Sequence, residues 1–163
     1  MHIRFADIND LEQLVKIYNQ AIIAGGATAD MEPFTVTSRL PWFNDHQKDR
    51  YPIYVVELEN HVIGYGCLSA YRKGRGALDT TAEISYYIDY DYHGRGIGKF
   101  LISYMMNDCD RLGLENLLAI LIDVNRSSRK ILENFGFKEW GLLPNVVNVN
   151  GIICNHLIMG INL

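Results

Sequence analysis

The order of strand-like and helix-like segments predicts an α/β fold built around a mixed sheet. Apolar residues switch along the chain between a spacing of about two, typical of strands, and about 3.6, typical of helices. The chain has 163 residues, of which 48% are hydrophobic, and is long enough to bury one core. No linker, repeat or low-complexity segment interrupts it. We therefore expect a single domain over residues 1–163.

The first half of the chain is expected to form a strand, two helices and a strand hairpin. Asp7 is a helix N-cap, because its carboxylate accepts hydrogen bonds from unpaired amides, and Gly25 and Gly26 end the helix. Pro41 interrupts the second helix. A tight turn at Glu59 joins two strands rich in β-branched and aromatic residues. The expected strands are 2–6, 51–59 and 61–71, and the expected helices are 8–24 and 37–48.

The second half alternates strand and helix and then ends in two strands. An apolar stripe from Ile97 to Leu112 indicates a helix that Gly113 ends. A shorter helix ends at Gly136. The expected strands are 81–90, 117–124, 138–143 and 152–160, and the expected helices are 97–112 and 125–135.

Residues 92–101, YHGRGIGKFL, place three glycines where a predicted strand gives way to a helix. Gly94, Gly96 and Gly98 leave the backbone bare at this point. Unpaired backbone amides, together with the positive end of the helix dipole, form a binding site for an anion such as a pyrophosphate. Two basic side chains within the same stretch add positive charge.

Two named phosphate-binding motifs do not fit this stretch. A Walker A loop requires serine or threonine after Lys99, where Phe100 stands. A dinucleotide-binding loop requires a third glycine, where Lys99 or Leu101 stands. The remaining alternatives are an anion-binding loop of another kind and a glycine-rich turn that binds no ligand.

Composition and charge argue against several classes of function. The net charge is −4, from 15 basic and 19 acidic residues, whereas nucleic acid is bound by clustered lysine and arginine. The longest apolar run, residues 117–122, is too short to cross a membrane. Three widely spaced cysteines form no disulfide framework and fit a reducing cytoplasm. The five histidines lack metal-ligand spacing, so we expect no metal.

Two separated motifs resemble the GNAT superfamily of acyl-CoA N-acyltransferases. The acetyl-CoA loop of that superfamily usually reads R/Q-x-x-G-x-G/A, and residues 93–98 read HGRGIG. Its later helix usually reads N-x-x-S/A-x-x-L before G-F, and residues 125–131 read NRSSRKI before Gly136 and Phe137. The resemblance implies a mixed, largely antiparallel sheet with one splayed pair of strands and with helices on both faces.

Two further segments resemble the phosphinothricin acetyltransferase group of that superfamily. The A-T-x-x-x-E-P pattern of the group is present at residues 27–33, and its R-x-A-x-D-x-T-A-E pattern is present at residues 75–83. The resemblance runs almost end to end. It implies an N-acetyltransferase that uses acetyl-CoA as cosubstrate.

The resemblance also implies a cofactor site. Backbone amides of the glycine loop are expected to bind the pyrophosphate of acetyl-CoA, and the strand before the loop is expected to border the pantetheine arm. His93 replaces the usual arginine or glutamine at the start of the loop. The expected cofactor contacts are Ile88, His93, Gly94, Arg95, Gly96, Ile97, Gly98, Lys99, Asn125, Ser128 and Arg129.

Glu83 is the candidate catalytic base. An amine attacks an acyl group only when it is neutral, and amines with pKa values of about 8 to 10 are mostly protonated at neutral pH. The water-relayed base of the superfamily occurs at this position; a polar strand residue that faces solvent is the alternative. No general acid is assigned, because Leu132 stands where many members have a tyrosine. Tyr86 and Tyr87 are interpreted as packing residues.

The predicted acceptor is the primary amine of a small molecule, an amino acid or an analogue of one. Ala29 stands where the phosphinothricin group usually has phenylalanine, and Asn155 where it usually has aspartate, which argues against phosphinothricin itself. Acetylation of a protein or peptide, and a non-catalytic acyl-CoA sensor, remain alternatives. Close relatives are often dimers, and the apolar C-terminal strands are compatible with a homodimer. The expected substrate contacts are Thr28, Glu32, Arg75 and Asn155.

Overall fold

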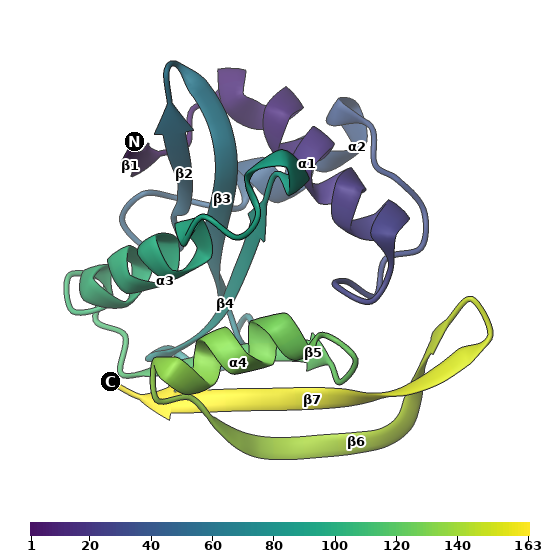
Figure 1. The fold of residues 1–163 in the computed structure, drawn as a ribbon. Coiled ribbons are helices and arrows are strands. Elements are labelled where there is room, and N and C mark those ends of the chain that lie inside the picture. Colours follow the sequence, from purple (N-terminus) through teal and green to yellow (C-terminus); the bar gives the residue numbers. More distant parts are fainter.

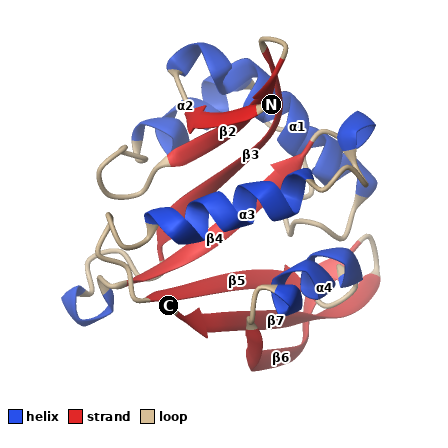
Figure 2. Ribbon diagram, turned by 60° about the vertical axis from the view of Figure 1, so that its left-hand side comes forward, coloured by secondary structure: helices blue, strands red, loops and turns tan.

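The computed structural model describes all 163 residues and contains a seven-stranded sheet with helices on both faces (Figure 1, Figure 2). The strand order is β1-β2-β3-β4-β5-β7-β6, and only the neighbours β4 and β5 are parallel. This mixed, largely antiparallel sheet confirms the predicted fold class. The strands are β1 (His2–Phe5), β2 (Ile53–Leu58), β3 (His61–Ala70), β4 (Thr81–Ile88), β5 (Asn116–Ile122), β6 (Lys138–Val149) and β7 (Ile152–Asn162). The helices are α1 (Leu11–Ala24), α2 (Val36–Asn44), α3 (Ile97–Asp108) and α4 (Arg126–Asn134).

The last hairpin is longer than the sequence pattern predicts. β6 continues to Val149, whereas the pattern predicts its end at Leu143. Pro144 and Asn145 resemble a turn in the sequence, but here they lie in a bulge, where the register shifts between Leu143 and Val147 and Asn145 has a φ of 56°. β6 is an edge strand, and an edge accommodates a proline and a bulge because its outer amides have no partner strand.

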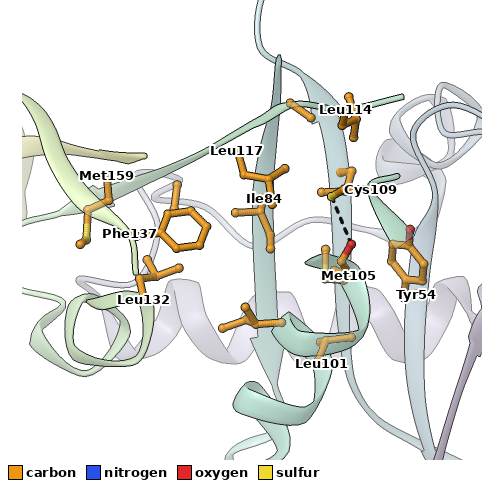
Figure 3. Packing of buried hydrophobic residues seen from close by; sticks show 14 of the residues in the cluster. Tyr54, Ile84, Leu101, Met105, Cys109, Leu114, Leu117, Leu132, Phe137 and Met159 are labelled. Atoms are coloured by element: carbon orange, nitrogen blue, oxygen red, sulfur yellow. Dashed lines mark hydrogen bonds between the residues drawn. The ribbon is translucent and has the colours of Figure 1, made fainter. Parts of the chain in front are cut away.

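The two faces of the sheet carry different helices and different parts of the core. α1 and α2 cover one face, where Leu14 and Tyr65 are buried. α3 and α4 cover the other face, where Leu101, Met105 and residues of the central strands pack together (Figure 3). A Cβ atom on Gly66 of β3 would lie 2.5 Å from Sδ of Met105, so glycine lets α3 approach the sheet closely. None of the helices combines the length and hydropathy that crossing a membrane requires.

β4 and β5 are paired at one end and diverge at the other. The pairing covers Thr81–Glu83 and Asn116–Leu118, but β4 continues to Ile88 and β5 to Ile122. α3 follows the diverging end of β4, and α4 follows the diverging end of β5 (Figure 2). Since ligands of α/β sheets bind beyond the carboxyl ends of parallel strands, this divergence positions a site between two helix N-termini.

Candidate active site

A cavity of about 550 Å³ opens where β4 and β5 diverge. Its walls are residues 84–88 of β4, 119–121 of β5, the glycine loop and the first turn of α4. Ala21 of α1 also lines it, so the cavity reaches around the open edge of β4 toward the opposite face of the sheet. A ligand in this cavity would contact backbone groups of β4 that have no partner strand.

The glycine loop has the backbone conformation that binding of an anion requires. Gly94 and Gly96 have φ angles of 76° and 79°, which side chains rarely adopt, and no heavy atom lies within 4 Å of where their Cβ atoms would stand. Gly96 is the N-cap of α3, and no side chain caps this helix. The first amides of α3 therefore remain unpaired at the cavity wall, where an anion can accept their hydrogen bonds.

The basic residues around the loop differ in whether their side chains are free to bind an anion. Nε2 of His93 donates to the backbone oxygen of Ile88 at 2.9 Å, so this N–H is not free to bind a phosphate. Arg95 donates to the backbone oxygen of Asp91 at 3.1 Å and does not line the cavity. Lys99 lines the cavity, is exposed and makes no ion pair. Lys99 is thus the basic side chain best placed to meet an anion.

The N-terminus of α4 forms the opposite wall. Asn125 caps the helix by accepting from the backbone N–H of Ser128 at 3.2 Å, and both residues line the cavity. Arg129 does not line it, because its guanidinium pairs with Glu133 at 3.0 Å and with Glu139 at 3.3 Å. The structure therefore brings most predicted cofactor contacts together, but not Arg95 and Arg129.

Glu83 is the last residue of β4 that pairs with β5. Its side chain lies on the face of the sheet that α1 and α2 cover, as alternation along β4 requires, while Ile84 belongs to the core under α3. The carboxyl is half-buried and does not line the main cavity. Burial raises the pKa of Glu83, and a hydrogen-bonding influence of Ser85 opposes this in part. A carboxylate with a raised pKa is a better acceptor of an ammonium proton.

Two polar features of the site escape prediction from the sequence, one on each face of β4. The ring of His46, just after α2, is hydrogen-bonded to Ser69 of β3, which lies opposite Glu83. The hydroxyl oxygen of Tyr86, interpreted from the sequence as a packing residue, is buried at the cavity wall without a hydrogen-bond partner. Burial raises the pKa of Tyr86, and the nearby Ser128 opposes this in part. No motif connects these residues in the sequence.

The four predicted substrate contacts do not meet in one place. Oγ1 of Thr28 lies 2.8 Å from the hydroxyl of Tyr18, in the loop after α1. Glu32 and Arg75 are exposed, and neither forms an ion pair. The Asn155 side chain donates to Asp123 at 2.7 Å, which fastens β7 to the end of β5. No cluster of three or more His, Cys, Asp or Glu side chains is arranged to hold a metal ion.

Comparison with known proteins agrees with this geometry. The sequence profile of the acetyltransferase (GNAT) family matches residues 11–137. YwnH of Bacillus subtilis, provisionally named a phosphinothricin acetyltransferase, is 38% identical over 151 residues, 93% of this chain and 92% of its own. The L-methionine sulfoximine/L-methionine sulfone acetyltransferase of Salmonella typhimurium is 30% identical over 146 residues, 90% of this chain and 85% of its own.

The structure of a related protein has been solved with acetyl-CoA bound. The GNAT superfamily phosphinothricin acetyltransferase of Sinorhizobium meliloti, in complex with AcCoA, superposes with a TM-score of 0.93 at 28% identity, covering 99% of this chain and 88% of that one. The resemblance inferred from the two motifs is confirmed. The chain belongs to the acetyltransferase (GNAT) family and is an acetyl-CoA-dependent N-acetyltransferase.

Proposed function

We propose that this enzyme acts in the cytoplasm and transfers an acetyl group to the primary amine of a free amino acid or an amino acid analogue. The observation that carries the proposal is the position of Glu83, a half-buried carboxyl where β4 and β5 diverge. The acceptor class follows the relatives, since methionine sulfoximine and phosphinothricin are amino acid analogues with a free amine. The cysteines are free thiols, as is usual in a reducing compartment.

The cavity residues fit acetyl-CoA. The uncapped N-terminus of α3 and the open glycine loop suit a pyrophosphate, and Lys99 adds a positive charge. The unpartnered hydroxyl of Tyr86 offers a hydrogen bond where a ligand would lie between α3 and α4. When bound there, acetyl-CoA supplies the activated acetyl group. Ile88, Asn125 and Ser128 complete the proposed contacts.

In the proposed mechanism, Glu83 takes the proton that the acceptor ammonium must lose, directly or through one water. The neutral amine would then attack the thioester carbonyl carbon, so that the C–N bond forms and the C–S bond breaks. CoA leaves as a thiolate, which takes up the second proton that the nitrogen loses on forming the amide. Backbone amides along the open edge of β4 are placed to donate to the carbonyl oxygen as negative charge develops there. Leu132 is fully buried and apolar, so no side-chain acid is assigned at that position.

The acceptor is proposed to bind on the face of β4 that carries Glu83. Thr28 follows Ala27, which lines the cavity, and its hydroxyl lies 2.8 Å from that of Tyr18. The guanidinium of Arg75 is exposed and has no carboxylate partner, so it is available to the carboxylate of an amino acid. Glu32 and Asn155 remain proposed contacts, although neither lines the cavity.

A free-thiol assay over a panel of amines tests this function. Amino acids, methionine sulfoximine, methionine sulfone, phosphinothricin, polyamines and short peptides would each be supplied with acetyl-CoA. We expect thiol release with at least one amino acid or analogue, and little with polyamines or peptides. Turnover confined to peptides would contradict the proposal, as would tight CoA binding without turnover on any amine.

The pH dependence of the reaction should reflect the raised pKa of Glu83. Burial disfavours the carboxylate, so the carboxyl loses its proton at a pH above the ordinary glutamate value of about 4.3. Because only the carboxylate can accept a proton, kcat/KM should rise with pH through an acid limb that lies above that value. The limb should vanish from the profile of Glu83→Gln, whereas a limb at or below the ordinary glutamate value would contradict the assignment.

We also propose a homodimer that forms through the β6–β7 hairpin, which extends beyond the rest of the sheet (Figure 1). Its exposed apolar side chains include Val146 and Ile152, which are 58% and 66% exposed. Changing both to lysine should convert a dimer into a monomer, because burying two charges in an apolar interface is unfavourable. Light scattering after size exclusion measures the mass. Ile23→Lys, at a site 77% exposed on α1, is the control, and a monomeric wild type would refute the proposal.

A further inference from the structure

The hydrogen-bonded pair of His46 and Ser69 lies beside Glu83 and has no part in the mechanism above. Nε2 of His46 lies 3.1 Å from Oγ of Ser69, and Nδ1 lies 2.7 Å from the backbone oxygen of Trp42. A backbone oxygen only accepts hydrogen bonds, so Nδ1 must carry a hydrogen. In the neutral ring Nε2 is then an acceptor, and the hydroxyl of Ser69 donates to it.

Ser69 is bonded to this histidine and lies opposite Glu83 in the sheet, although no hydrogen bond joins Ser69 to the Glu83 carboxyl in this structure. The two residues are direct partners in the β3–β4 ladder, so their side chains lie on the same face with Cβ atoms about 4.5 to 5.5 Å apart. Because Ser69 gives its one proton to His46, only lone pairs remain for Glu83. Those lone pairs can accept from a protonated carboxyl but repel a carboxylate. The arrangement therefore matches the form that Glu83 takes after it has removed a proton from the amine.

The surroundings keep His46 neutral. Burial lowers the pKa of His46; the bond to Trp42 and the negative charge of Asp45 oppose this, while the positive charge of Arg39 acts with it. Asp45 is itself paired with Lys73 at 3.3 Å, which weakens its influence. The ring is also half-buried rather than enclosed, so it has access to solvent.

We propose that Ser69 and His46 form the exit path for the proton that Glu83 takes from the acceptor amine. The inference rests on the proposed role of Glu83. The carboxyl of Glu83 gives its proton to Oγ of Ser69 while Ser69 passes its own proton to Nε2 of His46. This leaves a carboxylate, an intact hydroxyl and an imidazolium. Loss of the Nε2 proton to water then restores the neutral ring with its hydrogen on Nδ1. Both residues act through Glu83 and are positioning residues for the base.

His46→Gln is the sharpest test. Glutamine can still accept from Ser69 and donate to Trp42, but it cannot take up a proton. We expect kcat to fall about 10-fold in dilute buffer, with KM for acetyl-CoA and the thermal midpoint unchanged. Added imidazole should restore kcat of this variant in a saturable way and leave the wild type unaffected. Ser69→Ala should also lose rate, whereas Ser69→Thr, which keeps the hydroxyl, should retain it.

His61→Gln is the matched control, because His61 is exposed and its ring bonds only to the backbone oxygen of Glu59. Wild-type kcat in His46→Gln would overturn the proposal, and so would a loss that imidazole does not restore. Nitrogen NMR of the ring gives a readout independent of turnover: a hydrogen on Nδ1 at neutral pH is expected, and one on Nε2 would refute the path. If the panel identifies an amine other than an amino acid, the same experiment is run with that amine, so the two proposals fail separately.

Discussion

Replacing Glu83 with glutamine should lower kcat/KM by about 10²- to 10⁴-fold, the range that general base catalysis typically contributes. Glutamine has nearly the same shape but cannot take a proton from an ammonium group. The affinity for acetyl-CoA should not change, because Glu83 does not line the cavity beside the glycine loop. The thermal midpoint should stay the same or rise, since a half-buried carboxyl is replaced by a neutral amide.

The defect of Glu83→Gln should shrink as the pH rises toward the pKa of the acceptor amine. Above that pKa the amine is already neutral and needs no base, so the variant and the wild type should converge. Glu12→Gln, at an exposed position of α1, controls for the loss of one charge. Wild-type activity in Glu83→Gln near neutral pH would remove Glu83 from the mechanism, and a constant defect at every pH would indicate a role in geometry instead of proton transfer.

The parts of the fold that depend on local chemistry are predictable from the sequence. Element order follows from apolar periodicity, and the splayed strand pair follows from the family resemblance that the two motifs carry. The extent of β6 is not predictable in this way, because Pro144 and Asn145 have the composition of a turn. Whether they end a strand or form a bulge depends on whether the strand lies at the sheet edge, which is a property of the whole sheet.

Some residues of the candidate site can likewise be predicted from the sequence, and others cannot. The glycine loop can be found because backbone angles such as the φ of 79° at Gly96 impose glycine locally. The contact between His46 and Ser69 cannot be predicted from the sequence, because the turn after α2 and the end of β3 come together only in the folded chain. Arg129 is the opposite case. It lies within the motif of residues 125–131, but its guanidinium pairs with Glu133 and Glu139 and does not line the cavity.

Replacing Leu101 with alanine should destabilise the protein by about 2 to 5 kcal/mol, because the side chain is fully buried in the core between α3 and the sheet (Figure 3). That is a large part of the total of about 5 to 15 kcal/mol that a domain typically has. For a chain of this size the thermal midpoint should fall by about 4 to 20 °C. Phe100→Ala, one residue earlier and 39% exposed, should cost much less.

The same pair of variants tests whether the cofactor loop depends on the core beneath α3. A ligand present at 100 times its Kd stabilises the folded state by about 2.7 kcal/mol. Acetyl-CoA should therefore raise the thermal midpoint of Leu101→Ala and of Phe100→Ala by similar amounts, because the loop conformation is imposed locally at Gly94 and Gly96. A cofactor-induced shift that is lost only in Leu101→Ala would contradict this. It would show that packing of α3 against the sheet, as well as the glycines, holds the first amides of the helix in place for the anion.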